Sequence, residues 1–206
     1  IKELNADDTV DGVLVQLPLP KHISEAKVIE TIDKNKDVDG FHPLNVAGLW
    51  QKTPHMEPCT PKGIMYLLKE MGIDPKGKRA VVIGRSNIVG LPVAKMLLDA
   101  NATVTQCHTR TVDMPSITRQ AEILVVAAGK AKMVTGDMVS EGVVVIDVGM
   151  DRDPETGKLC GDVDFESVAP KASAITPVPG GVGPMTIACL MQNTVECFLR
   201  KMKADV

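Results

Sequence analysis

The chain has 206 residues, of which 44% are apolar, and this is enough to fill a hydrophobic core. A formal net charge of −3, with one Trp, one Tyr and three Phe, leaves neither a basic face nor stacking platforms for nucleic acid. No apolar run approaches the roughly 20 residues that cross a bilayer, and the N-terminus lacks a signal-peptide pattern. We therefore expect a globular cytoplasmic protein, or a mitochondrial one in a eukaryote, that binds neither nucleic acid nor membrane.

The chain begins with Ile1 rather than Met, and residues 1–5 look like the end of a helix, so we expect the natural protein to extend further. The four histidines have no metal-ligand spacing, and we expect no metal site. The five cysteines contain no C-x-x-C pair, which argues against a disulfide framework. For Cys59 a buried inert thiol is favoured over a reactive one.

Runs rich in Val and Ile alternate with helical patterns along the chain. Most of the runs are continuous rather than interrupted by polar residues, which is typical of parallel strands covered on both faces. The predicted fold class is therefore α/β, with a parallel sheet and right-handed crossovers. The expected strands are residues 12–17, 79–84, 102–107, 123–128, 143–148 and 173–176, and the expected helices are residues 25–33, 60–71, 89–100, 115–121 and 185–202.

Cap residues indicate where these helices start. Ser24 is predicted to N-cap the helix at 25–33, and Thr60, followed by Pro61, to start the next one. Pro184 stands just before the last helix. A domain boundary is expected near Thr60.

A glycine turn joins the strand at 79–84 to the helix that follows it. Its pattern, Gly84-x-Ser86-x-x-x-Gly90, departs from G-x-G-x-x-G, so an ordinary strand-to-helix turn is the alternative. Unpaired N–H groups and the helix dipole favour an anion at such a place, and a dinucleotide fits it.

The residues around this turn favour NADP over NAD. Arg85 brings a cation to the turn itself. The next strand is followed by Thr109 and Arg110, where an NAD-binding protein usually carries an acidic residue for the ribose hydroxyls. A 2′-phosphate suits them better, although a solvated surface arginine is an equal alternative for Arg110.

Three other segments contain candidate functional residues. Gln16 is a single polar side chain at the end of a predicted buried strand, where an amide needs partners that a ligand can supply. Asp37 and Asp39 flank a glycine turn, which turn capping alone would explain. Residues 175–186 hold three glycines and three prolines, which indicates a loop held in one unusual shape, with a plain tight turn as the alternative.

Five motifs resemble one family, the bifunctional methylenetetrahydrofolate dehydrogenase/methenyltetrahydrofolate cyclohydrolases. They follow the family's order over nearly the whole chain, so the resemblance is specific. The motifs are QLPLP at 16–20, DVDG at 37–40, PCTP at 58–61, GRSNIVGLP at 84–92 and PGGVGPMT at 179–186.

This resemblance implies oxidation of 5,10-methylenetetrahydrofolate by NADP, followed by hydrolysis of the methenyl product to 10-formyltetrahydrofolate. It implies part of a folate-binding catalytic domain at 1–60, a Rossmann-like NADP-binding domain at 61–175, and a cleft loop with a final helix at 176–206. It also implies a place in one-carbon metabolism and purine biosynthesis, and a homodimer formed through the cofactor domain.

The resemblance also assigns roles to single residues. Asp39 looks like the carboxylate that binds the pterin, and Gln16 like the amide beside the reacting centre, so we expect both to be catalytic. Pro179, Gly180 and Gly181 look like the substrate cleft, and bulky residues at either glycine are expected to damage turnover more than stability. The expected NADP contacts are Gly84, Arg85, Ser86, Thr109 and Met150.

The chain departs from the family in one respect. The family's catalytic lysine, and the tyrosine beside it, lie N-terminal to everything in this sequence, so we expect the chain alone to be inactive. Tyr66 is expected to pack in the core, and position alone does not make Lys62 a base. Two alternatives stay open: another NADP dehydrogenase of shikimate-dehydrogenase-like layout, and a non-catalytic NADP-binding module.

Overall fold

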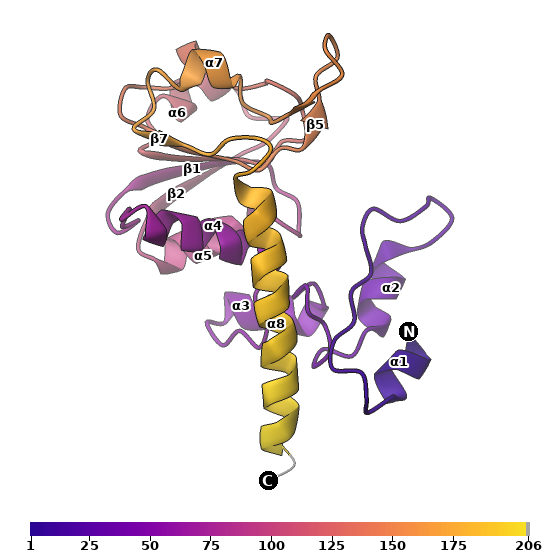
Figure 1. The fold of residues 1–206 in the computed structure, drawn as a ribbon. Helices are drawn as coiled ribbons and strands as arrows, with labels where there is room; N and C mark the ends of the chain where they lie inside the picture. The colour runs from indigo at the N-terminus through magenta and orange to yellow at the C-terminus, as the bar shows by residue number, and fades with distance from the viewer. Residues whose placement is uncertain (205–206) are drawn as a thin grey trace.

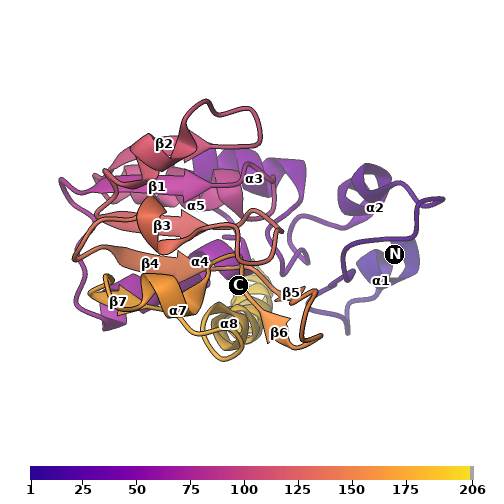
Figure 2. The ribbon, with the colours of Figure 1, turned by 90° about the horizontal axis from the view of Figure 1, so that it is seen from above.

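A five-stranded parallel sheet forms the centre of the molecule, and its strands run in the order β2-β1-β3-β4-β7. The computed structural model describes residues 1–204, so the last two residues of the predicted segment 176–206 lie outside it. All five strands were predicted from the sequence, and Figure 2 shows them side by side. They are β1 (Arg79–Ile83), β2 (Thr103–Cys107), β3 (Ile123–Val126), β4 (Val144–Asp147) and β7 (Ala174–Ile175).

Helices cover both faces of the sheet, which explains why β3 and most of β1 and β4 are apolar and buried, whereas the edge strand β2 alternates with Thr and Gln. Alternate strand residues such as Val82 and Val125 pack with α4 (Cys59–Glu70) and α5 (Gly90–Asp99). Their neighbours on the opposite face pack with α6 (Met114–Thr118) and α7 (Phe165–Val168). The prediction of a doubly covered parallel sheet is confirmed.

The first forty residues differ from the prediction. The strand expected at 12–17 is absent from the structure, and this stretch forms only one isolated parallel bridge, between Val13 and Asp37. Val13 is 5% exposed but Leu14 is 42% exposed, so the apolar run has one buried position rather than a covered face. Two short helices flank the stretch, α1 (Lys2–Ala6) and α2 (Glu25–Thr31).

Helix starts were predicted with mixed success. Ser24 caps α2 as expected, since its hydroxyl accepts a hydrogen bond from the Lys27 amide. The cap expected at Thr60 is wrong, because α4 already begins at Cys59 after an N-cap at Pro58.

Several short elements were not predicted. α3 (Pro43–Trp50) has Pro at its first position and His42 as its cap, signals that the sequence does contain. The 3-10 turn at Gly136–Met138 and the hairpin of β5 (Asp151–Arg152) and β6 (Leu159–Cys160) have two or three residues per element. Such lengths give no measurable periodicity.

The last helix, α8 (Val182–Ala204), is the longest of the described elements. It begins three residues before the expected start, and it packs along α4. Figure 1 shows it running from the edge of the sheet down to the level of α3 and the N-terminal helices. One helix therefore contacts both halves of the molecule.

Within residues 1–204, no helix combines the length and the apolar character needed to cross a membrane. All five cysteines are unpaired, and four of them are buried. Cys59 is among the buried ones, and burial raises the pKa of its thiol to about 12. These features agree with the expectation of reduced, inert thiols.

Candidate active site

The turn after β1 is shaped by a glycine that no other residue can replace without strain. Gly84 has φ +113°, and a Cβ built on it would lie 2.0 Å from the Ala127 carbonyl oxygen. Its N–H donates to the Cys107 carbonyl at 2.9 Å, and its own carbonyl accepts a hydrogen bond from the Gln106 side chain. Gly84 is therefore locked between the ends of the strands on either side of β1.

The start of α5 follows this turn closely. The Ser86 hydroxyl accepts hydrogen bonds from the amides of Val89 and Gly90, at 3.2 and 3.3 Å. Arg85 and Ser86 are both exposed at the carboxyl edge of the sheet. A helix N-terminus with an adjacent guanidinium is suited to bind a phosphate group.

The loop after β2 lies next to this turn, because Ile83 pairs in register with Cys107. The Arg110 amide donates to the His108 ring nitrogen Nδ1 at 3.1 Å, which fixes the loop. Thr109 and Arg110 are both exposed there. The donors that the sequence assigned to a 2′-phosphate are thus gathered at one edge of the sheet, and they suit that group chemically.

Buried carboxylates organise the loop after β4. Asp147, 4% exposed, accepts from the amides of Gly149 and Asp162, at 2.9 and 3.0 Å. Asp162, 0% exposed, accepts from three successive amides at 128–130. Burial, followed by the hydrogen bond from Asp151, raises the pKa of Asp162 to about 6. The sequence placed Asp147 at the end of a predicted strand, 143–148, but showed no sign of Asp162, whose amide partners are 32 to 34 residues away along the chain.

Met150 leaves this loop and reaches the start of α8. Its side chain is 67% exposed, and its Cε lies 3.6 Å from the place of a Cβ on Gly183. Met150, the predicted nicotinamide contact, therefore lies next to the loop at 179–183.

Asp37 and Asp39 are adjacent in sequence but have different environments. Asp37 is buried and accepts hydrogen bonds from the Gly40 amide, the His42 amide and the Asn45 side chain, at 3.1, 2.8 and 2.8 Å. It is the turn-capping residue that the residue type suggested. Asp39 is half-buried, and the side-chain donor near its carboxylate is the Cys59 thiol, which is a weak one. Burial, and then the nearby Asp37 charge, raise the pKa of Asp39 to about 6.

Gln16 is not in a buried strand, contrary to the expectation. It is exposed on an extended stretch, and its amide donates to the Leu17 carbonyl at 2.8 Å. The stretch has no neighbouring strand to bury it. A cavity of about 480 Å³ nevertheless begins at the next residue and extends to the glycine turn. It is lined by Leu17, Pro18, Glu25, Ala26, Ile29, Ser86, Asn87 and Ile88.

The loop before α8 is held in one shape, as its composition predicted. The Val178–Pro179 bond is cis, and Gly180 has φ +103°. Gly181 is buried, and a Cβ on it would lie 2.5 Å from the Pro177 carbonyl oxygen. This close packing corrects the expectation for Gly181, since any side chain there would disturb the fold as well as turnover.

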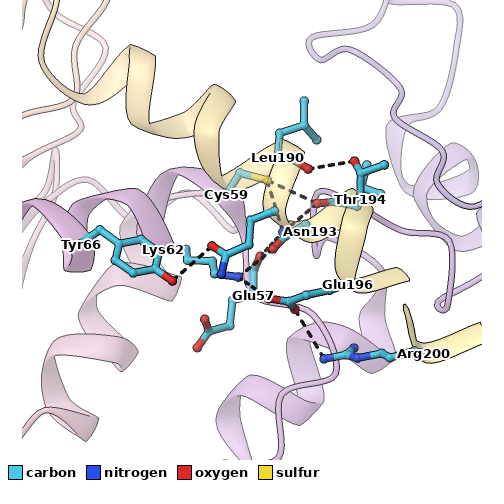
Figure 3. Close-up of polar contacts among 11 residues, drawn as sticks. Glu57, Cys59, Lys62, Tyr66, Leu190, Asn193, Thr194, Glu196 and Arg200 are labelled. Atoms are coloured by element: carbon cyan, nitrogen blue, oxygen red, sulfur yellow. Dashed lines mark hydrogen bonds and ion pairs between the residues drawn. The ribbon is translucent and has the colours of Figure 1, made fainter. Parts of the chain in front are cut away.

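Lys62 and Tyr66 point from α4 toward α8 (Figure 3). The Lys62 ammonium, 7% exposed, donates to Asn193 Oδ1 at 2.9 Å and to Glu196 Oε1 at 3.1 Å. The Tyr66 hydroxyl donates to Gln192 Oε1 at 3.2 Å. Lys62 is thus a paired structural amine, and Tyr66 is half-buried between helices rather than in the core.

A larger cavity, of about 730 Å³, lies among α3, α4 and α5. It is lined by residues such as Leu49, Met65 and Met96, and by none of the predicted site residues. Among residues 1–204, no three His, Cys, Asp or Glu side chains form a group that could hold a metal ion.

Comparison with known protein families agrees with this arrangement of the chain. Residues 58–202 match the tetrahydrofolate dehydrogenase/cyclohydrolase NAD(P)-binding domain, and residues 1–39 match the catalytic domain of the same family. The chain belongs to the tetrahydrofolate dehydrogenase/cyclohydrolase family. The resemblance read from the five motifs is confirmed, and the shikimate-dehydrogenase-like alternative is displaced.

Individual members of the tetrahydrofolate dehydrogenase/cyclohydrolase family are close to this chain. The bifunctional protein FolD of Magnetococcus marinus is 63% identical over 196 residues, which are 95% of this chain and 68% of that protein. FolD of Listeria innocua is 59% identical over 205 residues, 100% of this chain and 72% of that protein. The crystal structure of the bifunctional enzyme FolD from Campylobacter jejuni superposes with a TM-score of 0.93, at 56% identity, over 96% of this chain and 71% of that chain.

Proposed function

We propose that this chain serves the NADP-dependent oxidation of 5,10-methylenetetrahydrofolate and the hydrolysis of the methenyl product to 10-formyltetrahydrofolate. The observation that carries the proposal is the half-buried Asp39 carboxylate, with only the weakly donating Cys59 thiol near it, together with the glycine turn at Gly84. The bifunctional names of the relatives support it, as does a 42% identical Trypanosoma brucei member whose structure holds NADP and an inhibitor.

On the cofactor side, Arg85, Ser86 and Thr109 bind the phosphates of NADP, and Arg110 adds positive charge beside the 2′-phosphate. Gly84 allows the close approach of the dinucleotide, and the Met150 backbone meets the nicotinamide end. When bound, NADP supplies the hydride acceptor. The chain's own part is to hold the acceptor next to the loop at 179–181.

On the folate side, Asp39 accepts hydrogen bonds from the N–H edge of the pterin. Its environment supports this role, because a half-buried carboxylate with only a thiol donor nearby gains much from a ligand that donates to it. Gln16 lies beside the reacting carbon, where its exposed amide can orient the attacking water. Pro179, Gly180 and Gly181 present backbone, without side chains, to the flat rings.

The proposal includes the domain division at 1–60, 61–175 and 176–206, and a homodimer formed through the cofactor domain. β2 is an edge strand of the sheet, which leaves one side of it available for a second subunit. Light scattering checks the dimer directly: a mass near 44 kDa, about twice the chain mass of 22.0 kDa, is expected.

Binding is the direct test of the proposed function. Titration calorimetry is expected to show NADP bound at least about tenfold more tightly than NAD, and 5,10-methenyltetrahydrofolate bound to the NADP complex. Equal affinity for the two nucleotides would contradict the phosphate assignment. Binding of NADP without any folate would instead favour the non-catalytic module.

Turnover is tested by following NADPH formation at 340 nm with 5,10-methylenetetrahydrofolate. NADPH formation would support the assignment of the dehydrogenase reaction to this chain. Binding of both ligands without NADPH formation would favour a binding role for this chain alone.

A further inference from the structure

Asn193, in the middle of α8, uses its whole side-chain amide to join three other segments (Figure 3). It is 0% exposed. Its Nδ2 donates to the carbonyls of Val38 and Glu57, each at 2.9 Å, and lies 3.4 Å from the Cys59 sulfur. Its Oδ1 accepts from Lys62 at 2.9 Å. Both amide protons and the acceptor oxygen are therefore satisfied by groups distant in sequence.

The two carbonyls that Asn193 holds belong to loops packed backbone against backbone. Gly40 has φ +72°, and a Cβ on it would lie 2.8 Å from the Glu57 carbonyl carbon and 2.8 Å from the Pro58 nitrogen. Val38, 3% exposed, packs in the same place. The turn at 37–40 and the segment before α4 thus form one unit, and Asn193 ties that unit to α8.

This unit carries Asp39, whose carboxylate has only the weakly donating Cys59 thiol beside it. Its position is therefore set through the backbone on either side of it. Asp37 holds the turn from within, through the amides of Gly40 and His42. Asn193 holds the carbonyl of Val38, the residue immediately before Asp39, to the last helix.

The same helix carries the predicted substrate loop at its start. α8 begins at Val182, directly after residues 179–181. At a rise of roughly 1.5 Å per residue, Asn193 lies about 16 Å along the helix from Val182. Between them the Thr186 hydroxyl meets the Thr60 hydroxyl at 2.9 Å, so α8 is also fixed to α4. The helix acts as a rigid spacer between Asp39 and the loop.

We propose that Asn193 is a positioning residue for the folate half of the site: by holding the Val38 and Glu57 carbonyls to α8, it sets Asp39 at a fixed distance from the loop at 179–181. The inference rests on the proposed function, in which Asp39 binds the pterin. The hydrogen bonds of Asn193 described above involve none of the residues assigned to NADP, so cofactor binding should not depend on it.

The test compares two variants of the same network. Asn193→Leu keeps the branched shape of the side chain and removes both donated hydrogen bonds together with the one accepted from Lys62. Lys62→Met removes the hydrogen bond at the opposite end of the amide but leaves Val38 and Glu57 held. Both variants break the Lys62–Asn193 contact between α4 and α8, and Lys62→Met breaks the Lys62–Glu196 ion pair as well. A role confined to joining α4 and α8 therefore predicts a loss in Lys62→Met at least as large as that in Asn193→Leu.

Affinity for 5,10-methenyltetrahydrofolate, measured with the full chain saturated by NADP, is the first readout. Asn193→Leu is expected to weaken it at least about tenfold, while Lys62→Met leaves it within about threefold. The affinity for NADP should stay within about twofold in both. Equal losses of folate affinity in the two variants, or none in Asn193→Leu, would overturn the proposal.

The titration of Asp39, followed by NMR of ¹³C-labelled aspartate, is a second readout that needs no folate. The groups facing its carboxyl are the Asp37 carboxylate and the Cys59 thiol. In the wild type and Lys62→Met its pKa should stay near 6, and in Asn193→Leu it should fall toward the ordinary value of about 3.9, because a released carboxylate gains water. An unchanged pKa in Asn193→Leu would contradict the positioning role.

The two readouts separate the inference from the function on which it rests. A wild-type chain that binds no folate, with the pKa change present, would refute the pterin assignment and leave the positioning role standing. If Asn193→Leu does not fold, the smaller Asn193→Ser gives the same comparison, because its hydroxyl is too short to reach both carbonyls.

Discussion

The cofactor half and the folate half of this molecule are built in different ways. In the cofactor half the site lies at the ends of parallel strands, and backbone geometry shapes it: Gly84 fits under the Ala127 carbonyl, and α5 starts directly after it. In the folate half, Asp39 lies on an irregular loop held from within by Asp37 and tied by Asn193 to a helix at the other end of the chain. The first kind of site follows from local structure, whereas the second depends on tertiary packing.

The largest effect is expected from a change to the backbone of the cofactor half. Gly84→Ala combines a positive φ with a Cβ 2.0 Å from Ala127 O, so it should lower the free energy of unfolding by about 3 kcal/mol or more. Gly142→Ala is the control, because Gly142 has φ +80° and open space around it, and it should cost about 1 kcal/mol. Urea denaturation measures both. Equal losses would mean that the close approach at Gly84 is not decisive.

The next effect concerns the loop that joins the halves. Gly181→Ala should lower the free energy of unfolding by about 2 kcal/mol, since its Cβ would lie 2.5 Å from Pro177 O and 2.8 Å from Thr176 Cβ. Gly183→Ala, two residues later, meets only the Met150 methyl group at 3.6 Å and should be neutral or slightly stabilising. Thermal melts compare the two. A destabilised Gly183→Ala with an unaffected Gly181→Ala would refute this packing.

Asp39→Asn should stabilise the protein while it weakens folate binding. The folded-state pKa of Asp39, about 6, lies above the unfolded value of about 3.9. The folded state therefore binds more protons between these values, and stability falls as pH rises from about 4 to 6. At pH 7.5 the substitution should raise the free energy of unfolding by about 1–2 kcal/mol, a gain that should vanish below pH 4.

Melting curves at both pH values measure this gain, and Asp37→Asn is the control. Asp37 accepts three hydrogen bonds in the turn, so its replacement should destabilise the protein at pH 7.5. A loss of stability in Asp39→Asn at pH 7.5 would show that the carboxylate has a strong partner in the folded protein besides the Cys59 thiol.

The smallest effect tests the start of α5. Ser86→Ala removes a cap that accepts from two amides, and it should cost about 1 kcal/mol and weaken NADP binding a few-fold. Ser24→Ala removes the cap of α2 at a similar cost and should leave NADP binding unchanged. Titration calorimetry with both variants provides the measurement. Equal NADP affinity in the two variants would show that Ser86 does not contribute to the cofactor site.

What could be predicted from the sequence follows the same division. The strands and the glycine turn were predicted because apolar runs, glycines and helix starts are local signals. The strand expected at 12–17 failed because burial of an apolar run depends on a neighbour, which only Val13 has, through Asp37. Asn193 went unnoticed, since nothing local distinguishes a buried asparagine with three partners from a solvated one on a helix.

The most direct test of the account is the affinity of Asp39→Asn for 5,10-methenyltetrahydrofolate and for NADP, measured side by side with the wild type at pH 7.5. The account predicts a loss of about 30-fold or more for the folate, because charged hydrogen bonds are lost, with the NADP affinity within about twofold. Unchanged folate affinity, or a parallel loss of NADP affinity, would contradict a folate half that is built around Asp39 and separate from the cofactor half.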